Sequence, residues 1–293
     1  MITIFSNPRP FNGPFDLIQQ NAIKSWKHLN SKVQIILFED EEGTTKKIAN
    51  ELHVDLITDV KTNEFGTPLI DGVFEKIKEY AKFDIVAQVN ADIILSNDFV
   101  KTINKVCLLL EKNPFLMVGR RWDLDVRKAI KFDSQGMWFQ KLINRLPFEG
   151  KLHGMSGIDY WIFRKDYLFD PPPFVVGRPG FDSWLVYKAR SNKIPVIDAT
   201  ELITIIHQNH DYPLKREESF HIECERNFKL VGGYRFAFSL RDANKLIDEN
   251  GIKNPGFPKI IYSMLSTNYF WRIILMIKRK IHKYFKTVLK ISI

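Results

Sequence analysis

The sequence predicts an α/β fold in which a mostly parallel, Rossmann-like sheet carries helices on both faces. Between Ile2 and Val118, short apolar runs alternate with segments of helical spacing, which is the pattern of βαβ units. The apolar runs are continuous, as in strands that are buried on both faces. With 293 residues, 45% of them hydrophobic and 26% charged, the chain can bury a large core. This composition excludes disordered and collagen-like proteins.

The first part of the chain gives the regular elements. Apolar runs predict five strands, at Ile2–Phe5, Val33–Phe38, Val54–Ile57, Ile85–Val89 and Phe115–Val118. Helical spacing predicts helices at Pro14–Leu29 and Thr44–Leu52, a third that Thr67 and Pro68 open and that ends at Tyr80, and a fourth that Asn97 or Asp98 caps and that ends at Glu111. In such sheets, ligands bind at the carboxyl ends of the strands.

The second part of the chain is less regular. It predicts strands at Tyr160–Phe163, Pro195–Ile197 and Leu202–Ile206, and a helix at Ser183–Ser191. No internal repeat or low-complexity linker divides the chain. We therefore expect one domain over residues 1–255 and a tail over residues 256–293.

The excess positive charge lies in that tail. The net charge is +9, and the segment from Asn250 to Ile293 contains basic residues but no Asp or Glu, so the body is formally neutral. A neutral body argues against a nucleic-acid-binding protein. On a helix, the tail would place basic residues (Arg272, Arg279, Lys283, Lys286 and Lys290) opposite an apolar face. This basic amphipathic helix predicts binding to an anionic membrane surface. In the alternative, its apolar face packs on the body.

The location follows from what the sequence lacks. The chain starts without the basic and apolar segments of a secretion signal, and it has no apolar run of about 18 residues. Its two cysteines, Cys107 and Cys224, cannot form a disulfide scaffold and fit a reducing compartment. We expect a cytoplasmic protein that binds peripherally to the inner face of a membrane.

Two groups of polar residues follow predicted strands and suit a divalent cation. Asn90 and Asp92 come directly after a buried strand, where two oxygen-bearing side chains can share Mg²⁺ or Mn²⁺. The alternative is an Asx-turn that closes the strand. His207 and His210 follow another strand, and imidazole is a good ligand for Mn²⁺. Their alternative is a polar loop with surface histidines.

Two further groups contain a carboxylate. Asp182 precedes a predicted helix, where it suits either a helix cap or a general base toward a substrate hydroxyl. Asp159 belongs to a glycine-containing loop from His153 to Trp161, and such a mixture of acid and aromatic residues is frequent in carbohydrate sites. The alternative for this loop is the edge of the core.

In this order, the motifs resemble a family. Asn90-Ala91-Asp92, Ser156-Gly157-Ile158-Asp159, Gly180-Phe181-Asp182 and His207 resemble motifs of nucleotide-sugar glycosyltransferases of the GT-A fold, in the order of the β-1,4-galactosyltransferase-like members. The resemblance implies a metal-binding role for Asp92, Asn90 and His207, with His210 as the rival histidine. It also implies Asp182 as the base of an inverting transfer to a glycan or lipid-linked acceptor. Asn90 departs from the usual Asp, and Phe181 replaces the acid that usually precedes the base.

The resemblance also implies a donor site without choosing among UDP-, GDP- and dTDP-sugars. Asn7, Arg9 and Asp40 follow the first two strands, where this fold binds the nucleoside, and Arg120-Arg121 suit phosphates or the acceptor. Asp159 is expected to contact the same ligand. Two other functions stay open: a nucleotidyltransferase that forms nucleotide sugars, and a non-catalytic module docked on a membrane. The glycine-poor loop Ser6–Gly13 disfavours the nucleotidyltransferase.

Overall fold

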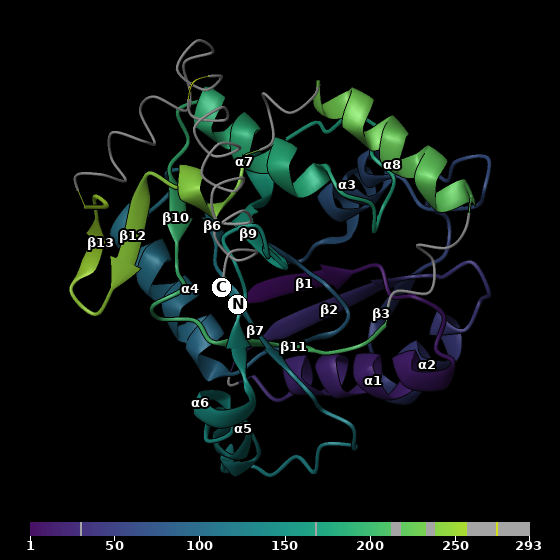
Figure 1. Cartoon of the computed structure of the whole chain (residues 1–293), viewed down its shortest axis with the longest axis horizontal. Helices are drawn as coiled ribbons and strands as arrows, with labels where there is room; N and C mark the ends of the chain where they lie inside the picture. The colour runs from purple at the N-terminus through teal and green to yellow at the C-terminus, as the bar shows by residue number, and fades with distance from the viewer. Residues whose placement is uncertain (30, 168, 212–217, 233–237, 257–273, 275–293) are drawn as a thin grey trace, which may run out of the picture.

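The computed structural model describes residues 1–29, 31–167, 169–211, 218–232, 238–256 and 274. In these residues, a central sheet has the strand order β13-β12-β10-β6-β9-β4-β1-β2-β3 (Figure 1). Its strands are β1 (Ile2–Ser6), β2 (Val33–Phe38), β3 (Asp55–Ile57), β4 (Ile85–Val89), β6 (Leu116–Val118), β9 (Tyr160–Arg164), β10 (Val196–Asp198), β12 (Lys245–Asp248) and β13 (Gly251–Lys253).

The central sheet is mixed but mostly parallel, as the sequence predicts. β1 pairs in parallel with β2 and β4, and β10 does so with β6 and β12. β9 is antiparallel to both β4 and β6, and the edge strand β13 is antiparallel to β12. A second, smaller sheet has the order β5 (Ile93–Ile94), β11 (Ile205–Gln208), β7 (Arg121–Leu124), β8 (Lys151–Leu152). It brings the segment after β4 beside the histidine-bearing strand β11.

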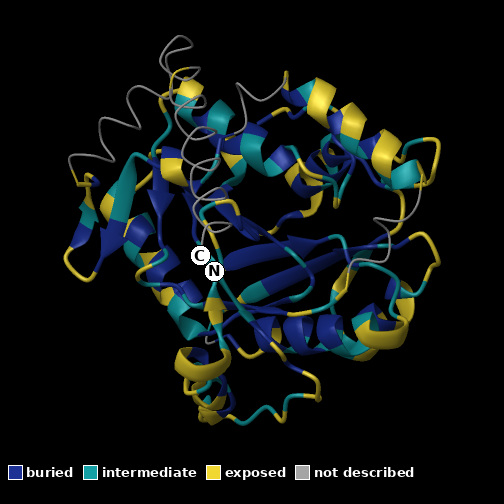
Figure 2. Ribbon diagram, viewed as in Figure 1, coloured by how far each residue is buried: buried dark blue, intermediate teal, exposed yellow. Residues whose placement is uncertain are grey.

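Helices cover both faces of the central sheet, as Figures 1 and 2 show. α1 (Gly13–Lys27), α2 (Thr45–Leu52) and α4 (Asn97–Leu110) lie on one face, and α3 (Ile70–Tyr80), α7 (Phe181–Ser191) and α8 (Glu218–Val231) lie on the other. α5 (Met137–Ile143) and α6 (Leu146–Glu149) pack with the second sheet in a separate small core.

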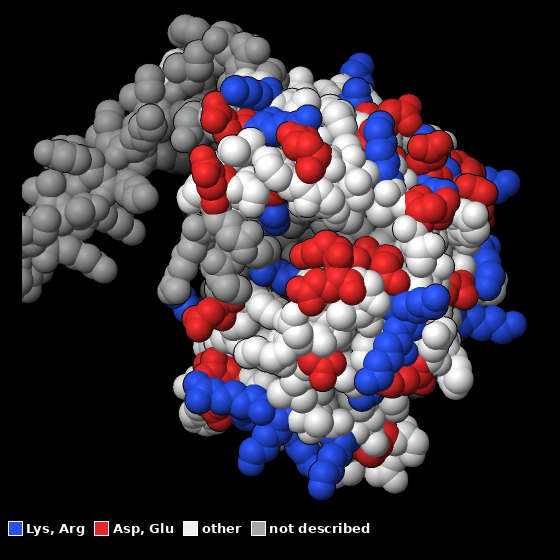
Figure 3. Space-filling view, turned by 90° about the vertical axis from the view of Figure 1, so that its right-hand side faces the viewer, with Lys and Arg blue, Asp and Glu red and all other residues white. Residues whose placement is uncertain are grey.

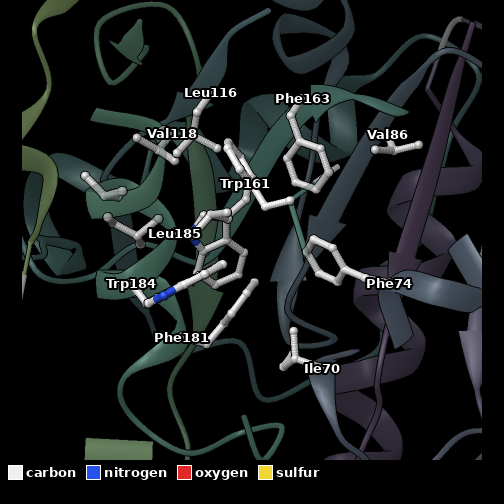
Figure 4. Packing of buried hydrophobic residues seen from close by; sticks show 14 of the residues in the cluster. Ile70, Phe74, Val86, Leu116, Val118, Trp161, Phe163, Phe181, Trp184 and Leu185 are labelled. Atoms are coloured by element: carbon white, nitrogen blue, oxygen red, sulfur yellow. The ribbon is translucent and has the colours of Figure 1, made fainter. Parts of the chain in front are cut away.

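The periodicity of each helix explains which face it buries. In α1, Ile18, Ala22 and Trp26 recur every four residues and are buried. On the opposite face, Phe74 of α3 stacks on Phe163 of β9 with ring centroids 5.8 Å apart (Figure 4). Burial of one such side chain stabilises the fold by about 1.5–3 kcal/mol.

Several predicted boundaries differ from the structure. Pro68 pairs with Thr62 in a β-bridge, so α3 begins only at Ile70. The N-cap of α4 is Ser96, whose hydroxyl donates to Asp98, and neither Asn97 nor Asp98 occupies that position. The strand expected at Leu202–Ile206 is Ile205–Gln208, because the amide groups of residues 202 and 203 donate to the carbonyl of Ala199 in a turn. His207 consequently lies within β11.

The expected tail helix, with its basic and apolar faces, lies outside the described residues, apart from Gly256 and Ile274. The division at residue 255 and the membrane contact therefore stay predictions. Among the helices of the described part, none combines the length and the apolar character that crossing a membrane requires.

Candidate functional site

A cavity of about 650 Å³ opens at the carboxyl ends of β1, β2 and β4. Figure 3 shows the hollow on this face of the molecule, with acidic side chains gathered beside it. Most of the predicted site residues line this cavity: Asn7, Arg9, Asp40, Asn90, Asp92, Arg121, Asp159, Asp182, His207 and His210. Arg120, expected at phosphates or the acceptor, does not line it, and its Nε donates to the carbonyl of His153 at 2.7 Å. The fold therefore gathers into one place residues that are up to 203 positions apart in the chain.

Asp92, His207 and His210 form a cluster that suits a metal ion. Oδ2 of Asp92 lies 3.3 Å from Nε2 of His207 and 3.1 Å from Nε2 of His210. The three ligand atoms lie within 4.8 Å of one another. Asp92 Oδ1 is buried without a hydrogen-bond partner, and the buried ring nitrogens of His207 make only long contacts, Nε2 with Asp92 at 3.3 Å and Nδ1 with Asp123 at 3.4 Å. Because unpartnered buried polar atoms are costly, these atoms fit a site that a divalent cation completes.

The same groups perturb each other's protonation. Burial alone would raise the pKa of Asp92, but hydrogen bonds and attraction from His207 and His210 outweigh it and hold that pKa well below its usual range. Burial would lower the pKa of His207, and Asp92 reverses this effect and raises it. A cation would displace the histidine proton, so metal binding here competes with protonation.

Asn90 belongs to an adjoining network rather than to this trio. Its side-chain amide donates to Asp159 Oδ1 at 2.7 Å, and its backbone N–H donates to the Asp159 carbonyl at 3.0 Å. Arg121 Nη1 lies 2.9 Å from both oxygens of Asp159. Burial and the neighbouring Asp92 raise the pKa of Asp159, although Arg121 opposes them. Asn90 therefore lies at the edge of the cluster, and its role as a metal ligand stays a prediction.

The network continues to Asp123, which has no role in the sequence-based prediction, and to His153, which opens the loop expected at a carbohydrate site. Asp123 accepts from Arg121 Nε at 2.8 Å and pairs with His153 Nδ1 at 2.7 Å. Its Oδ1 also lies 3.4 Å from His207 Nδ1. Burial would raise the pKa of Asp123, but His153 and Arg121 lower it. The available signal was the spacing: Arg121 and Asp123 are two residues apart, so they share one face of β7.

Asp182 lies in the first turn of α7. The N-cap is Gly180, whose φ of 130° favours glycine, so the prediction of a helix that starts after Asp182 is wrong by two residues. The Asp182 carboxylate accepts from the backbone N–H of Gly180 at 3.3 Å and is half-buried in the cavity wall. Burial, reinforced by Asp159, raises its pKa against the backbone hydrogen bonds that lower it. A carboxylate with a raised pKa is a stronger base.

The cavity wall near β1 and β2 contains the three residues expected at the nucleoside. Both polar side-chain atoms of Asn7 are buried without a partner. The Arg9 guanidinium lies 5.1 Å from the centre of the Phe15 ring, which in turn packs against His210. Asp40 is engaged already, because it accepts from Thr44 Oγ1, from Thr45 Oγ1 and from the Thr45 and Glu42 backbone N–H groups.

The facing wall comes from α8 and the segment before α7. Arg178 forms an ion pair with the buried Glu223 at 2.5 Å and lies 4.9 Å over the Phe220 ring. Asn227 fixes the same segment by bonding the N–H and carbonyl of Val175. Sequence analysis missed this wall entirely.

Comparisons with known proteins find remote likenesses in structure. No protein-family profile matches the chain, and no curated protein matches its sequence. Residues 1–349 of TarS from S. aureus, in complex with UDP-GlcNAc, align with a TM-score of 0.47 at 12% identity over 78% of this chain and 66% of that chain. Glucosyl-3-phosphoglycerate synthase from Mycobacterium tuberculosis, with Mn²⁺, UDP and phosphoglyceric acid, aligns with a TM-score of 0.44 at 13% identity over 80% and 79%. At these values, the site residues themselves have to carry a functional conclusion.

Proposed function

We propose that this chain is a metal-dependent glycosyltransferase that moves a sugar from a nucleotide-sugar donor to a hydroxyl of a glycan or lipid-linked acceptor. The observation that carries the proposal is the convergence of Asp92, His207 and His210 in one cavity with Asp182. The cavity lies at the carboxyl ends of parallel strands, where α/β sheets bind nucleotides. It combines a cation site with a separate carboxylate that can take a proton.

The cluster of one carboxylate and two imidazoles would hold Mn²⁺ or Mg²⁺, and the imidazoles favour Mn²⁺. When bound by these residues, the cation would supply positive charge that offsets the charge developing on the diphosphate leaving group. Asn7, with its unpartnered amide, and Arg9 would contact the nucleoside or its phosphates. Asp40 would shape the loop that holds the nucleoside, because its oxygens are already bonded to residues 42–45.

Asp182 would act on the acceptor. Its carboxylate takes the proton of the acceptor hydroxyl, the hydroxyl oxygen forms a bond to the anomeric carbon, and the bond from that carbon to the diphosphate breaks. The nucleoside diphosphate leaves with the electron pair of the broken bond. A single displacement of this kind inverts the configuration of the anomeric carbon.

A panel of nucleotide sugars tests the proposal. UDP-, GDP- and dTDP-sugars are added to the purified chain with and without Mn²⁺, and the melting temperature is measured, since a ligand that binds only the folded state raises it. We expect one nucleotide class to raise it, and only with the metal. Incubation of that donor with candidate acceptors then has to release nucleoside diphosphate and a glycosylated product. A chain that binds no donor, or that transfers no sugar and instead converts the nucleotide sugar and added pyrophosphate into nucleoside triphosphate and sugar phosphate, would contradict the proposal.

We also propose that the tail after Gly256 binds the chain peripherally to the anionic cytoplasmic face of a membrane. Its support is the charge pattern: basic residues without a single acid from Asn250 onward. A chain that ends after Gly256 should keep transfer to a water-soluble acceptor and lose flotation with anionic vesicles. Flotation that survives the truncation would place the membrane contact elsewhere.

A further inference from the structure

His153 lies in the cavity wall, and the proposed chemistry does not use it. It follows β8, its backbone N–H donates to the carbonyl of Arg121 in β7, and its side chain is 35% exposed. The side chain lines the same cavity as the metal-binding cluster. A histidine ring that is tied to the fold and also accessible from the cavity can contact a ligand there.

The hydrogen bond to Asp123 fixes which ring nitrogen carries the proton. His153 Nδ1 lies 2.7 Å from Asp123 Oδ2, and an ionised carboxylate can only accept. In the neutral ring, Nδ1 therefore holds the hydrogen, and Nε2 presents a lone pair. Among the described residues, Nε2 has no hydrogen-bonding partner. This lone pair suits a hydroxyl group, which is the donor that sugars offer in abundance.

Gly157 makes room for the ring. A Cβ atom at this position would lie 2.3 Å from His153 Cδ2 and 2.8 Å from Cγ, closer than any packing permits. The ring can therefore keep its place only while residue 157 lacks a side chain. This contact provides a way to move His153 without replacing it.

The same carboxylate links His153 to the cation site. Asp123 Oδ1 lies 3.4 Å from Nδ1 of His207, while Oδ2 holds His153. One carboxylate thus separates His153 from a residue that would bind the metal. The diphosphate of the donor would bind at that metal, and the sugar is attached directly to the diphosphate.

We propose that His153 is a specificity-determining residue that accepts a hydrogen bond from a hydroxyl of the donor's sugar, with Asp123 as its positioning residue. This inference rests on the proposed function. If the proposal is right, His153 contributes to the affinity for the nucleotide sugar but not to the affinity for the nucleoside diphosphate. A residue with only a structural role would affect both affinities.

Calorimetry in the presence of Mn²⁺ tests this distinction. The probes are UDP with UDP-glucose, GDP with GDP-mannose and dTDP with dTDP-glucose, and the pair that the native chain binds is used. His153→Ala should lower the affinity for the nucleotide sugar about tenfold, since one neutral hydrogen bond contributes about 0.5–1.5 kcal/mol. The affinity for the diphosphate should stay within about twofold of the native value. His28→Ala, an exposed histidine at the end of α1, is the matched control and should change neither.

Two further variants separate contact from fold. Gly157→Ala should give the same selective loss, because it displaces the ring. His153→Gln, whose amide oxygen accepts a hydrogen bond, should retain more affinity than His153→Ala. Asp123→Ala combined with His153→Ala should lose little more affinity for the nucleotide sugar, relative to the affinity for the diphosphate, than His153→Ala alone, because the contact of Asp123 with His207 affects both ligands alike.

The outcomes are distinguishable. If His153→Ala leaves the nucleotide-sugar affinity unchanged, or lowers the affinity for the diphosphate by the same factor, His153 is not a sugar-contacting residue, although the proposed function stands. If the native chain binds none of the six probes with Mn²⁺, the proposed function falls and the assignment of His153 falls with it.

Discussion

The two ends of the central sheet differ in how far their buried polar groups are hydrogen-bonded within the fold. At the amino ends of β1 to β3, Thr3 donates to Gln34 at 2.8 Å, and Gln34 donates to Asp55 at 2.7 Å and to the carbonyl of Tyr80 at 3.1 Å. The backbone N–H of Lys82 completes the set by donating to Gln34 Oε1. Every side-chain oxygen and nitrogen of Gln34 is thus used within the fold.

At the carboxyl ends, several buried polar atoms lack a well-formed hydrogen bond. Five of the described residues with such atoms line the cavity (Asn7, Gln88, Asp92, Trp161 and His207), whereas Asp71 and Tyr160 have such atoms outside it. A buried polar atom without a hydrogen bond costs about 1–3 kcal/mol, so such a concentration is retained only where something outside the chain completes it. The comparison teaches that a concentration of buried polar atoms without partners, rather than a single such atom, points to the binding cavity of this sheet.

The largest expected effect is at Asp92. Asp92→Asn removes the charge that would hold the cation, so Mn²⁺-dependent binding of the nucleotide should disappear in calorimetry, while the melting temperature changes little. Asp84→Asn is the matched control, because Asp84 is an exposed aspartate just before the amino end of the same strand, β4. Nucleotide binding by Asp92→Asn with its metal dependence intact would remove the cluster from the mechanism.

Asp182 should give the next largest effect. Asp182→Asn keeps the size of the side chain but not its basicity, so the transfer rate should fall by about 10²–10⁴-fold with donor binding retained. Burial raises the pKa of Asp182, and a base must be deprotonated. The native rate should therefore fall as the pH decreases through a pKa above that of an ordinary aspartate.

Two measurements check the role of Asp182. The exposed Asp166 supplies the control Asp166→Asn, which should transfer at the native rate. NMR of the product should show an inverted anomeric carbon. Retention of the anomeric configuration would contradict this role. So would an Asp182→Asn variant whose transfer rate still falls at low pH as the native rate does, and either result would assign the base to another residue.

The sequence predicts most of the regular fold because periodicity and burial agree there. The bounds of β2 and β4 are as predicted, and α1 and α2 differ only at their ends. α8 was missed because its buried positions, Glu223, Asn227 and Val231, recur every four residues but are mostly polar. Hydropathy cannot reveal a helix that buries a carboxylate and an amide.

The site was predictable to the extent that it follows strands. The carboxyl-end rule led to Asp92 and His210, and the fold brings both into the cavity. Asp123 and His153 were not predictable in this way. Asp123 lies within the short strand β7, whose apolar face consists of only Trp122 and Leu124, too few residues to predict a strand. His153 contacts Asp123 only through the pairing of β7 with β8. Their roles depend on a long-range contact that no local pattern encodes.

Gln34 tests the other side of the comparison. Gln34→Leu removes the centre of the amino-end network and leaves Thr3, Asp55 and the Lys82 N–H without it. The free energy of unfolding in urea should fall by about 1–3 kcal/mol, with no change in nucleotide affinity. Gln135→Leu, at an exposed loop position, should leave both unchanged. A loss of nucleotide affinity in Gln34→Leu would show that the two ends are not independent.

Asp40 should give the smallest effect. It distinguishes the position of a carboxylate in the sheet from whether its oxygens are already hydrogen-bonded within the fold. It lies at the carboxyl end, yet its oxygens accept from the segment that starts α2, as in the amino-end network. Burial would raise its pKa, but the hydrogen bonds from Thr45, Thr44 and Glu42 together lower it from its ordinary value. Because the folded pKa is the lower one, the stabilisation is present in full above the unfolded value and is lost as the pH falls through the folded value.

Asp40→Asn should therefore lower the free energy of unfolding by about 1–2 kcal/mol at pH 7. The difference from the native chain should begin to shrink below about pH 4, where the carboxyl of the unfolded chain takes up a proton, and should be lost as the pH falls through the lower folded pKa. Urea titrations at a series of pH values measure this convergence. If Asp40→Asn instead leaves the free energy of unfolding unchanged at pH 7 and lowers the affinity for the nucleotide, Asp40 is a ligand-binding residue. Hydrogen bonding within the fold would then no longer distinguish the structural carboxylates of this sheet from its functional ones.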